Sequence, residues 1–302
     1  MSVKKADLCN RFHLQMRYKH AASWRKPFIE PRRFFANQLR RFGIPRSATG
    51  AVRNVEAFHS SDFAIVVGEG VSTEIASYGV FEEDLTRAFL RLVQPDQVVV
   101  DIGMHLGYFT VLLAQLVGNG GQVHSFEPTP STRALAMRNV GRFSQVIVHP
   151  LAVWSSQRTM TFQDYGVQWM AFNSFTQARL DAAIKGTPFQ VETTTLDQLR
   201  RSLNRPISLV KIDAESAEKE ILIGAEELIK NDRPLLSVEV GDFGQERGSR
   251  DLVRWLEAAK YKAWDSTSSG FRPHEAKEQY AYGNLIFAPD GQDLNNMGRI
   301  PG

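Results

Sequence analysis

From about residue 97 onward, the hydrophobic and polar residues follow two alternating patterns. Short apolar runs with β-branched residues, typical of buried strands, alternate with segments whose apolar residues recur every three or four positions, as in amphipathic helices. This alternation predicts an α/β fold with a doubly wound, mostly parallel sheet. The predicted strands are 98–102, 122–126, 145–149, 207–213 and 235–240, with a closing antiparallel pair at 261–265 and 282–288.

Helices are predicted between these strands, and one insertion interrupts the pattern. Residues 155–190 combine two short strands with an aromatic-rich stretch that includes Tyr165, Trp169 and Phe172. Because long insertions at the edge of such a sheet often carry function, we predict that this segment covers the substrate. Apolar residues at helical spacing predict helices at 81–93, 108–117, 131–143, 214–229 and 252–259.

The turn after the strand 98–102 carries the candidate cofactor chemistry. It reads Asp101-x-Gly103-x-x-x-Gly107, and glycine at both positions lets the backbone approach a ligand and pack against the next helix. A dinucleotide turn has the spacing G-x-G-x-x-G and holds a pyrophosphate, which the carboxylate of Asp101 would repel. The same carboxylate attracts an ammonium or a sulfonium group. The turn therefore indicates S-adenosylmethionine (SAM) rather than a dinucleotide.

A second acid, Glu127, directly follows the next predicted strand and strengthens the SAM prediction. Open α/β sheets bind ligands at the carboxyl ends of their strands, where a carboxylate can accept hydrogen bonds from both ribose hydroxyls. Residues 151–154 follow the third strand and are expected to line the adenine. The predicted cofactor-binding residues are Asp101, Gly103, Met104, His105, Gly107, Tyr108, Glu127, Pro128, Ala152 and Asp213.

The composition is that of an ordinary globular chain. Of 302 residues, 43% are hydrophobic and 23% are charged. No apolar run approaches the length of a membrane span, and the N-terminus lacks the apolar core of a signal peptide. Cys9 is the single cysteine, so no disulfide can form within the chain. We therefore expect a reducing, cytoplasmic location.

Basic charge is concentrated at the N-terminus. Residues 1–46 hold 12 Lys or Arg and 2 Asp or Glu, whereas the rest holds 24 Lys or Arg and 31 Asp or Glu. Aromatic residues are interleaved with the N-terminal cations, and Phe35, Leu39 and Phe42 repeat at helical spacing, which predicts an amphipathic helix after Pro31.

Three interpretations of this N-terminal arm stay open. Its apolar face could dock on the protein's own core or on a second subunit, with the charges solvated. The arm could instead attract a phosphate-bearing substrate or an anionic lipid surface. It could also bind nucleic acid, although no recognisable nucleic-acid-binding module is present.

The length favours one large domain with an appendage over two equal domains. We divide the chain into a basic aromatic N-terminal arm at 1–50, a lead-in hairpin and helix at 51–95, and a cofactor-binding domain at 96–290. Residues 291–302 are rich in Gly, Asn and Pro, which predicts a frayed tail.

Assembled in order, these motifs resemble the FkbM family of SAM-dependent methyltransferases. The resemblance implies a seven-stranded, Rossmann-like class I methyltransferase fold. It also implies methylation of a hydroxyl oxygen on a sugar, glycan or polyketide-type natural product. The matching stretches are 99–103, 107–110, 126–128, Asn139, 194–197, 210–215, 217–218, 224–225, Glu239 and 284–287.

The chain departs from this family pattern at two places. The family commonly has Ala-Asn where this chain has Met104 and His105, which changes the lip of the SAM pocket. It commonly has Gly where this chain has Ser216, which tightens the turn after Asp213 and concerns the substrate side. We still expect SAM binding, because backbone amides do much of the holding at such a turn.

The predicted chemistry is simple, because the methyl group of SAM is already activated. The protein must align an acceptor oxygen with it and help remove a proton. Candidate bases are Asp213 and Glu239, since both end strands that open onto the methyl group, and His105 on the cofactor loop. A divalent metal held by Asp213, Glu239 and a sugar diol is conceivable but not favoured, and we expect no metal site.

Three other functions are compared with O-methylation. An NAD-dependent nucleotide-sugar oxidoreductase is disfavoured by the spacing of the glycine turn. An RNA methyltransferase could use the basic arm, but residues 213–216 are not the Asn/Asp-Pro-Pro-aromatic run that N-methylating enzymes often carry, so we expect no nucleic-acid partner. A catalytically silent scaffold with this fold stays open, as does a homo-oligomer.

Overall fold

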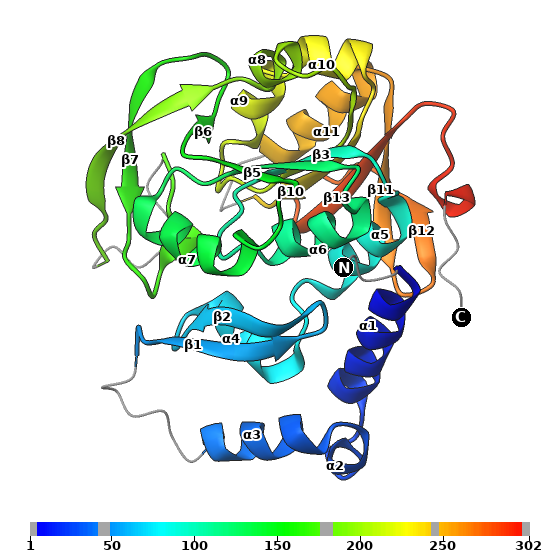
Figure 1. Ribbon diagram of the computed structural model, residues 1–302. Coiled ribbons are helices and arrows are strands. Elements are labelled where there is room, and N and C mark those ends of the chain that lie inside the picture. Colours follow the sequence, from blue (N-terminus) through cyan, green and yellow to red (C-terminus); the bar gives the residue numbers. More distant parts are fainter. Residues whose placement is uncertain (1–4, 42–48, 176–183, 243–247, 298–302) are drawn as a thin grey trace.

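Figure 1 shows the computed structural model, which describes residues 5–41, 49–175, 184–242 and 248–297. The central sheet contains β3 (Val98–Ile102), β4 (Gln122–Phe126), β5 (Val146–His149), β9 (Ile207–Ile212), β10 (Leu235–Val240), β11 (Tyr261–Thr267), β12 (Gly270–Pro273) and β13 (Gly283–Pro289). Their spatial order is β12-β11-β13-β10-β9-β3-β4-β5. The strands from β10 to β5 are parallel, and β13 lies antiparallel between β10 and β11.

This order confirms the predicted doubly wound α/β fold. From β3 the chain first adds β4 and β5 on one side of the sheet and later adds β9 and β10 on the other side. The carboxyl ends of β3, β4 and β9 therefore meet at a topological switch point. Each of the seven predicted strands is present to within two residues at either end. An eighth strand, β12, extends the edge through an antiparallel hairpin with β11.

Helices cover both faces of the sheet. One face packs against α5 (Glu83–Leu92), α6 (Tyr108–Val117) and α7 (Pro130–Val140), with α1 (Lys5–His20) beyond them. The opposite face packs against α8 (Leu196–Arg201), α9 (Glu218–Ile223), α10 (Glu226–Asn231) and α11 (Gly248–Ala258). Within the described ranges, no helix is long and apolar enough to cross a lipid bilayer.

The single helix predicted for 214–229 is wrong, because it is two short helices that begin later. Glu215 and Ser216 have φ values of +49° and +78°, so the backbone after β9 turns before α9 starts. Gly224 separates α9 from α10, and a Cβ atom on it would lie 2.3 Å from the carbonyl oxygen of Trp154. The positive φ at Ser216 also explains why glycine suits that position.

The described part of the predicted N-terminal arm consists of three helices. Helix α1 packs into the main core, where Leu8 and Phe12 are fully buried. Helices α2 (Lys26–Ile29) and α3 (Pro31–Arg41) lie beyond it, at the end of the molecule furthest from the sheet in Figure 1. The predicted lead-in follows as a hairpin of β1 (Val52–Ala57) and β2 (Ser60–Val66), then α4 (Gly70–Tyr78) and α5.

Two further segments complete the fold. The insertion forms β7 (Thr159–Asp164), η2 (Met170–Phe172) and β8 (Thr187–Thr194), and β8 also pairs with β6 (Ala152–Val153). The predicted frayed tail is instead packed as far as η3 (Leu294–Asn296). Leu294 is fully buried, and the side chain of Asn295 exchanges hydrogen bonds with the backbone of Phe271.

Candidate active site

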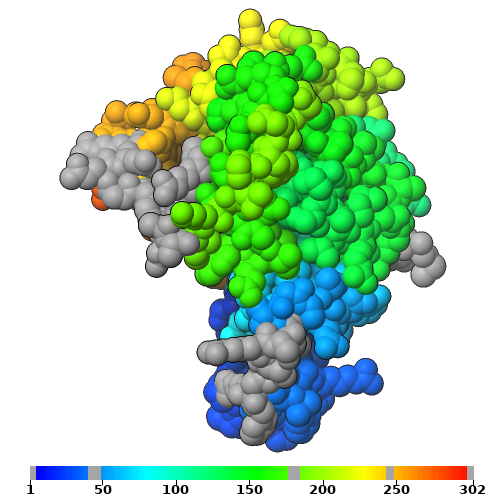
Figure 2. Space-filling model, turned by 90° about the vertical axis from the view of Figure 1, so that its left-hand side faces the viewer, coloured from blue at the N-terminus to red at the C-terminus, as the bar shows by residue number. Residues whose placement is uncertain are grey.

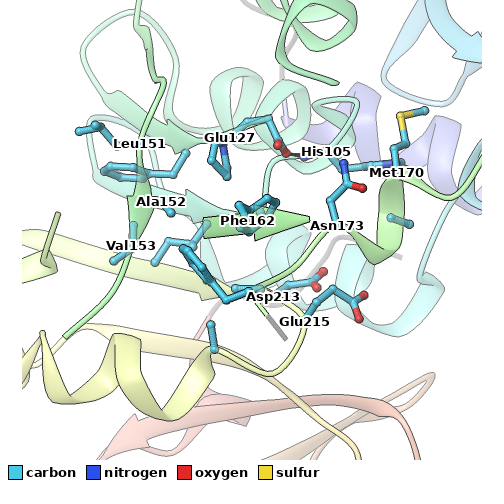
Figure 3. A pocket seen from close by; sticks show the side chains of 18 of the residues that line it. His105, Glu127, Leu151, Ala152, Val153, Phe162, Met170, Asn173, Asp213 and Glu215 are labelled. Atoms are coloured by element: carbon cyan, nitrogen blue, oxygen red, sulfur yellow. Dashed lines mark hydrogen bonds between the residues drawn. The ribbon is translucent and has the colours of Figure 1, made fainter. Parts of the chain in front are cut away.

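A cavity opens at the carboxyl ends of β3, β4 and β9, where such sheets bind ligands. Residues from the ends of these strands and from the insertion line it together. In Figure 3, Glu127 and His105 lie across this cavity from Asp213 and Glu215, with Phe162 between them. The predicted cofactor residues that line it are Gly103, His105, Glu127, Pro128, Ala152 and Asp213.

The glycine turn is formed as the sequence predicts. Gly103 has a φ of +74°, and a Cβ atom there would lie 1.9 Å from the carbonyl oxygen of Asp213. Gly107 has a φ of +82°, and its Cβ atom would lie 2.9 Å from the side chain of Val140. Both positions therefore require glycine, because a side chain would be strained and would push apart β9, α7 and the turn.

Glu127 is held rigidly at the end of β4. Its side chain is 7% exposed, and each carboxylate oxygen accepts one backbone hydrogen bond, from Thr129 at 3.0 Å and from His105 at 3.2 Å. The side chain of Thr129 also hydrogen-bonds Glu127. A carboxylate has about four acceptor positions, so these bonds do not use all of them. Glu127 lines the cavity and can accept both hydroxyls of a ribose, which fits SAM.

The insertion supplies the apolar wall of the same cavity. Together with Leu151, Val153 and Ala217, its residues form one lining of the cavity. This apolar lining suits an adenine ring. The insertion was predicted to cover a substrate, and in the structure it also covers the cofactor cavity. The residues it contributes are Phe162, Met170, Ala171, Asn173 and Phe175.

A buried lysine links the first and fourth parallel strands beneath the cavity. Lys211 is 1% exposed, and its Nζ lies 3.0 Å from Asp213 Oδ2 and 3.5 Å from Asp101 Oδ1. Burial alone would lower the pKa of Lys211, but Asp213, Asp101 and Glu82 together raise it above its ordinary value. Lys211 therefore stays charged and compensates two carboxylates at the base of the site.

Asp101, predicted to bind the cofactor, is not among the residues that line the cavity. It is fully buried and lies opposite Lys211 in the register of β3 and β9. Its Oδ2 accepts a hydrogen bond of 2.6 Å from Thr110. Burial raises the pKa of Asp101, which Lys211 and Thr110 oppose. Its place is therefore within the sheet, where it positions Lys211.

Three other predicted cofactor residues also lie outside the cavity lining. Met104 is buried in the main core, and Gly107 packs against α7. Tyr108 starts α6, and its ring centroid lies 4.5 Å from that of His59, on the side away from the cavity lining. The sequence pattern located the turn correctly. It could not show which side chains of the turn pack against neighbouring helices and which line the cavity.

Glu239 lines neither cavity, although one of its oxygens lies within 4.8 Å of oxygens of Asp213 and Glu215. It is 6% exposed on β10 and lies opposite Asn284 of β13 in the antiparallel register. Burial, followed by Asp213 and Glu215, raises the pKa of Glu239 well above its ordinary value, and its side chain hydrogen-bonds Tyr282. Because Glu239 lines neither cavity, Asp213 is better placed than Glu239 to meet a ligand there.

Glu82 and Asn284 extend this buried polar group. The amide of Asn284 donates a hydrogen bond of 3.0 Å to Glu82 Oε1. Burial and the charge of Asp213 raise the pKa of Glu82 to about 7. Glu82 directly precedes α5, but its side chain makes no capping hydrogen bond and turns toward Asn284 of β13.

His105 lies on the lip of the cavity as a neutral side chain. Burial lowers its pKa, although Glu69 and Asp213 act in the opposite direction. Its Nε2 is buried and, within the part of the chain that the structure describes, has no hydrogen-bond partner. Its φ of +49° is one that Asn also tolerates, consistent with the residue that the family commonly has there.

A second cavity adjoins the first and shares part of its wall. The shared residues are Val71, Phe81, Ala171, Glu215 and Tyr282. Trp169 and Tyr282 expose 38% and 59% of their surface, so aromatic rings are available to a ligand. Of the described residues that line this cavity, three are acidic and none is basic. They are Gly68, Glu69, Gly70, Val71, Phe81, Gln168, Trp169, Ala171, Phe172, Glu215, Gly241, Asp242 and Tyr282.

Three carboxylates gather where the two cavities meet. Asp213, Glu215 and Glu239 each bring an oxygen to within 4.8 Å of the others. Such a cluster alone does not make a metal site. Lys211 already pairs with Asp213 and supplies a positive charge to this cluster. These features fit a metal poorly, and we assign none.

The strand order, the glycine turn on β3 and the acid at the end of β4 define a class I methyltransferase with a Rossmann-like fold. Residues 101–263, more than half of the chain, match the family described as the methyltransferase FkbM domain. The chain therefore belongs to the FkbM family of SAM-dependent methyltransferases, as the motifs suggested.

Several named proteins are similar to this chain. The 31-O-demethyl-FK506 methyltransferase FkbM of Streptomyces tacrolimicus is 30% identical in an alignment of 173 residues that covers 47% of this chain and 65% of that protein. The crystal structure of methyltransferase FkbM from Methylobacillus flagellatus has a TM-score of 0.40 at 14% identity, covering 72% of this chain and 52% of that one. Aeropyrum pernix fibrillarin with bound SAM has a TM-score of 0.40 at 10% identity, covering 68% and 73%.

The pKa of Glu127 leads to a prediction of how SAM affinity depends on pH. Burial raises the pKa of Glu127 to about 7, although the Thr129 and His105 hydrogen bonds and Arg133 oppose the rise. Between pH 6 and pH 8 the ionised fraction rises from roughly one tenth to nine tenths. We expect the ionised form to accept hydrogen bonds from both ribose hydroxyls. The Kd for SAM should therefore fall about tenfold from pH 6 to pH 8 in the wild type, whereas Glu127→Gln should show no such fall. Calorimetry showing the same pH profile in both proteins would contradict this role.

Proposed function

We propose that the protein transfers a methyl group from SAM to a hydroxyl oxygen of a sugar, glycan or polyketide-type natural product. SAM supplies an activated methyl group, and the chain's own residues hold the two reactants and receive the proton. Glu127 and the apolar wall of the first cavity hold the nucleoside, and the second cavity holds the acceptor.

The observation that carries this proposal is the junction of the two cavities. Glu215 and Tyr282 line both cavities, and Asp213 lines the first beside Glu215. An acceptor in the second cavity therefore meets carboxylates at the point where the first cavity begins. A hydroxyl must lose a proton when it is methylated, and a carboxylate positioned there can accept it.

The lining of the second cavity supports a neutral polyhydroxylated or apolar acceptor. The exposed rings of Trp169 and Tyr282 offer flat apolar surface, and Glu215 on the shared wall can accept hydrogen bonds from hydroxyls. A phosphate-rich acceptor would be repelled by the carboxylates of this lining. The described lining therefore favours a hydroxyl-bearing molecule over a nucleic acid.

Asp213 is the proton acceptor in this proposal. It is the one of the three sequence-based candidates that both lines the cavity and carries a carboxylate held by a permanent cation, Lys211. His105 lies on the cofactor loop, where the family commonly has Asn, and Glu239 is buried outside both cavity linings. The methyl group of SAM is already activated, so an ion-paired carboxylate is basic enough for this step.

Methyl transfer can be tested with SAM labelled in its methyl group. We expect the purified chain to transfer label to neutral hydroxyl-bearing acceptors, tested as sugars, glycans and macrolide-type polyketides, and the product to be a methyl ether by mass spectrometry. Label on an amine nitrogen or on RNA would overturn the proposed O-methylation while leaving the SAM site intact. Tight SAM binding with no transfer to any acceptor class would support the silent scaffold instead.

A further inference from the structure

Helix α3 packs on the rest of the protein through its polar side. The guanidinium of Arg33, which is 7% exposed, donates to the carbonyl oxygens of Glu56 at 2.9 Å and Ala76 at 3.5 Å. One turn later, Asn37 donates to the hydroxyl of Tyr18 at 3.0 Å and to the carbonyl of Ser77 at 2.9 Å. Residues four apart share one face of a helix, so this face is the docked one.

The apolar side of α3 faces solvent. Phe35 and Leu39 are 61% and 72% exposed. At 3.6 residues per turn, they lie about 200° around the helix from Arg33 and Asn37. An amphipathic helix of a globular protein normally buries its apolar face and exposes its polar face. Helix α3 does the reverse, which indicates that something else covers Phe35 and Leu39.

Neighbouring residues enlarge this apolar face into a surface. Among the described residues, nine large apolar side chains are most exposed, and four of them lie between residues 24 and 39: Trp24 at 67%, Phe28 at 85%, Phe35 and Leu39. Of the other five, Val167, Trp169 and Tyr282 lie on or beside the second cavity, and Met137 and Ile223 stand on separate helices. We call Trp24, Phe28, Phe35 and Leu39 the basal surface.

The basal surface lies at one end of the molecule. Helices α2 and α3 form the end furthest from the sheet in Figure 1, and the same N-terminal segment projects from the main body in the space-filling view of Figure 2. A flat partner could therefore reach Phe28 and Phe35 without meeting the sheet domain. The two cavities stay open to solvent when such a partner binds, because their lining residues belong to other segments.

The charge around the basal surface is positive. Residues 17–39 contain six Lys or Arg, and Glu30 is their single acid. Arg33 is buried on the docked face and Lys19 pairs with Glu74, which leaves Arg17, Arg25, Lys26 and Arg32. Arg25 and Arg32 are exposed within this range, and Glu30 is occupied by a hydrogen bond from Gln15. Beyond residue 46 the chain has 24 Lys or Arg and 31 Asp or Glu. A negatively charged plane would therefore attract this end of the molecule and repel the other.

We propose that the basal surface binds the interface of an anionic lipid bilayer. Tryptophan, phenylalanine and leucine beside arginine and lysine are the combination that inserts into the headgroup region of anionic membranes. A second copy of the chain fits less well, because a symmetric contact would bring two sets of these cations together. The polar anchors Arg33 and Asn37 hold α3 so that its apolar face is preformed for the bilayer.

Vesicle co-sedimentation of the full chain tests this proposal. We expect binding to vesicles that contain phosphatidylglycerol, weaker binding to phosphatidylcholine alone, and loss of binding as salt is raised. The double variant Phe35→Ser/Leu39→Ser should reduce the partition coefficient roughly tenfold or more, because it removes two inserting side chains. Met137→Ser is the matched control, since Met137 is an exposed apolar residue on α7 and should leave partitioning unchanged.

SAM affinity and melting temperature, measured on the same samples, separate this surface from the active site. Both should be unchanged in the double variant, because Phe35 and Leu39 touch neither cavity. Failure of the wild type to bind anionic vesicles at low salt would overturn the proposal, as would equal binding by the double variant. Light scattering that shows a dimer dissolved by Phe35→Ser/Leu39→Ser would assign the surface to a second copy instead.

Discussion

Asp213→Asn should lower kcat for methyl transfer by about 100-fold or more, because the amide cannot accept the proton of the acceptor hydroxyl. The substitution keeps the shape of the side chain and its ability to accept the hydrogen bond from Lys211, which is 3.0 Å long in the wild type. The Kd for SAM should therefore change by no more than about threefold. Steady-state kinetics and calorimetry on the same preparation measure both quantities.

Two control variants decide whether the effect belongs to Asp213 itself. Glu215→Gln alters the neighbouring carboxylate of the same rim, and we expect kcat to fall by less than about tenfold. His105→Asn replaces the rival base by a residue that tolerates the positive φ, and we expect kcat close to that of the wild type. If His105→Asn abolished turnover while Asp213→Asn did not, the histidine would be the proton acceptor.

Lys211→Met should destabilise the fold by about 3–5 kcal/mol, the usual cost of leaving a buried charge without its partner. Methionine keeps the unbranched chain of the lysine, so the change removes charge rather than volume. Asp101 is fully buried, and Lys211 is the cation that compensates it at 3.5 Å. Urea unfolding at neutral pH measures the loss as a shift of the transition midpoint.

A second substitution at Asp101 should restore stability to the Lys211→Met variant. Asp101→Asn/Lys211→Met removes both buried charges, and we expect it to recover most of the lost free energy of unfolding. Lys219→Met, at an exposed position of α9, should stay within about 0.5 kcal/mol of the wild type. A Lys211→Met protein as stable as the Lys219→Met control would show that the Asp101 charge is compensated in another way.

The fold could be predicted from the sequence because its strands are short apolar runs with clear ends. The β3 and β4 predictions coincide with the observed strands, and helix 108–117 matches α6. The break between α9 and α10 could not be predicted, because the cause is a close approach of Gly224 to Trp154, 70 residues away in the chain. Local helical spacing contains no information about that contact.

The candidate site was predicted in part. Glu127 and Gly103 follow directly from their places after β4 and β3, and both line the cavity. Asp101 was assigned to the cofactor because it belongs to the same motif, but it lies within β3 and faces Lys211 of β9. That pairing depends on strand register, which a single sequence does not specify. The contribution of Tyr282 was missed because it comes from the C-terminal end of the fold.

The N-terminal segment shows a similar limit. The apolar spacing correctly predicted a helix after Pro31, which is α3. The sequence left open which face would dock, and the usual expectation is the apolar one. The polar face docks instead, because carbonyl groups of Glu56, Ala76 and Ser77 receive the side chains of Arg33 and Asn37. Those partners belong to β1 and α4, so tertiary structure alone reveals them.

A crystal structure of the protein with S-adenosylhomocysteine, the demethylated cofactor, tests the central claim most directly. We expect the nucleoside in the cavity at the ends of β3, β4 and β9, with both ribose hydroxyls donating to Glu127 and the adenine beside Leu151 and Phe162. A nucleoside bound at another place, or one whose ribose makes no contact with Glu127, would contradict the account.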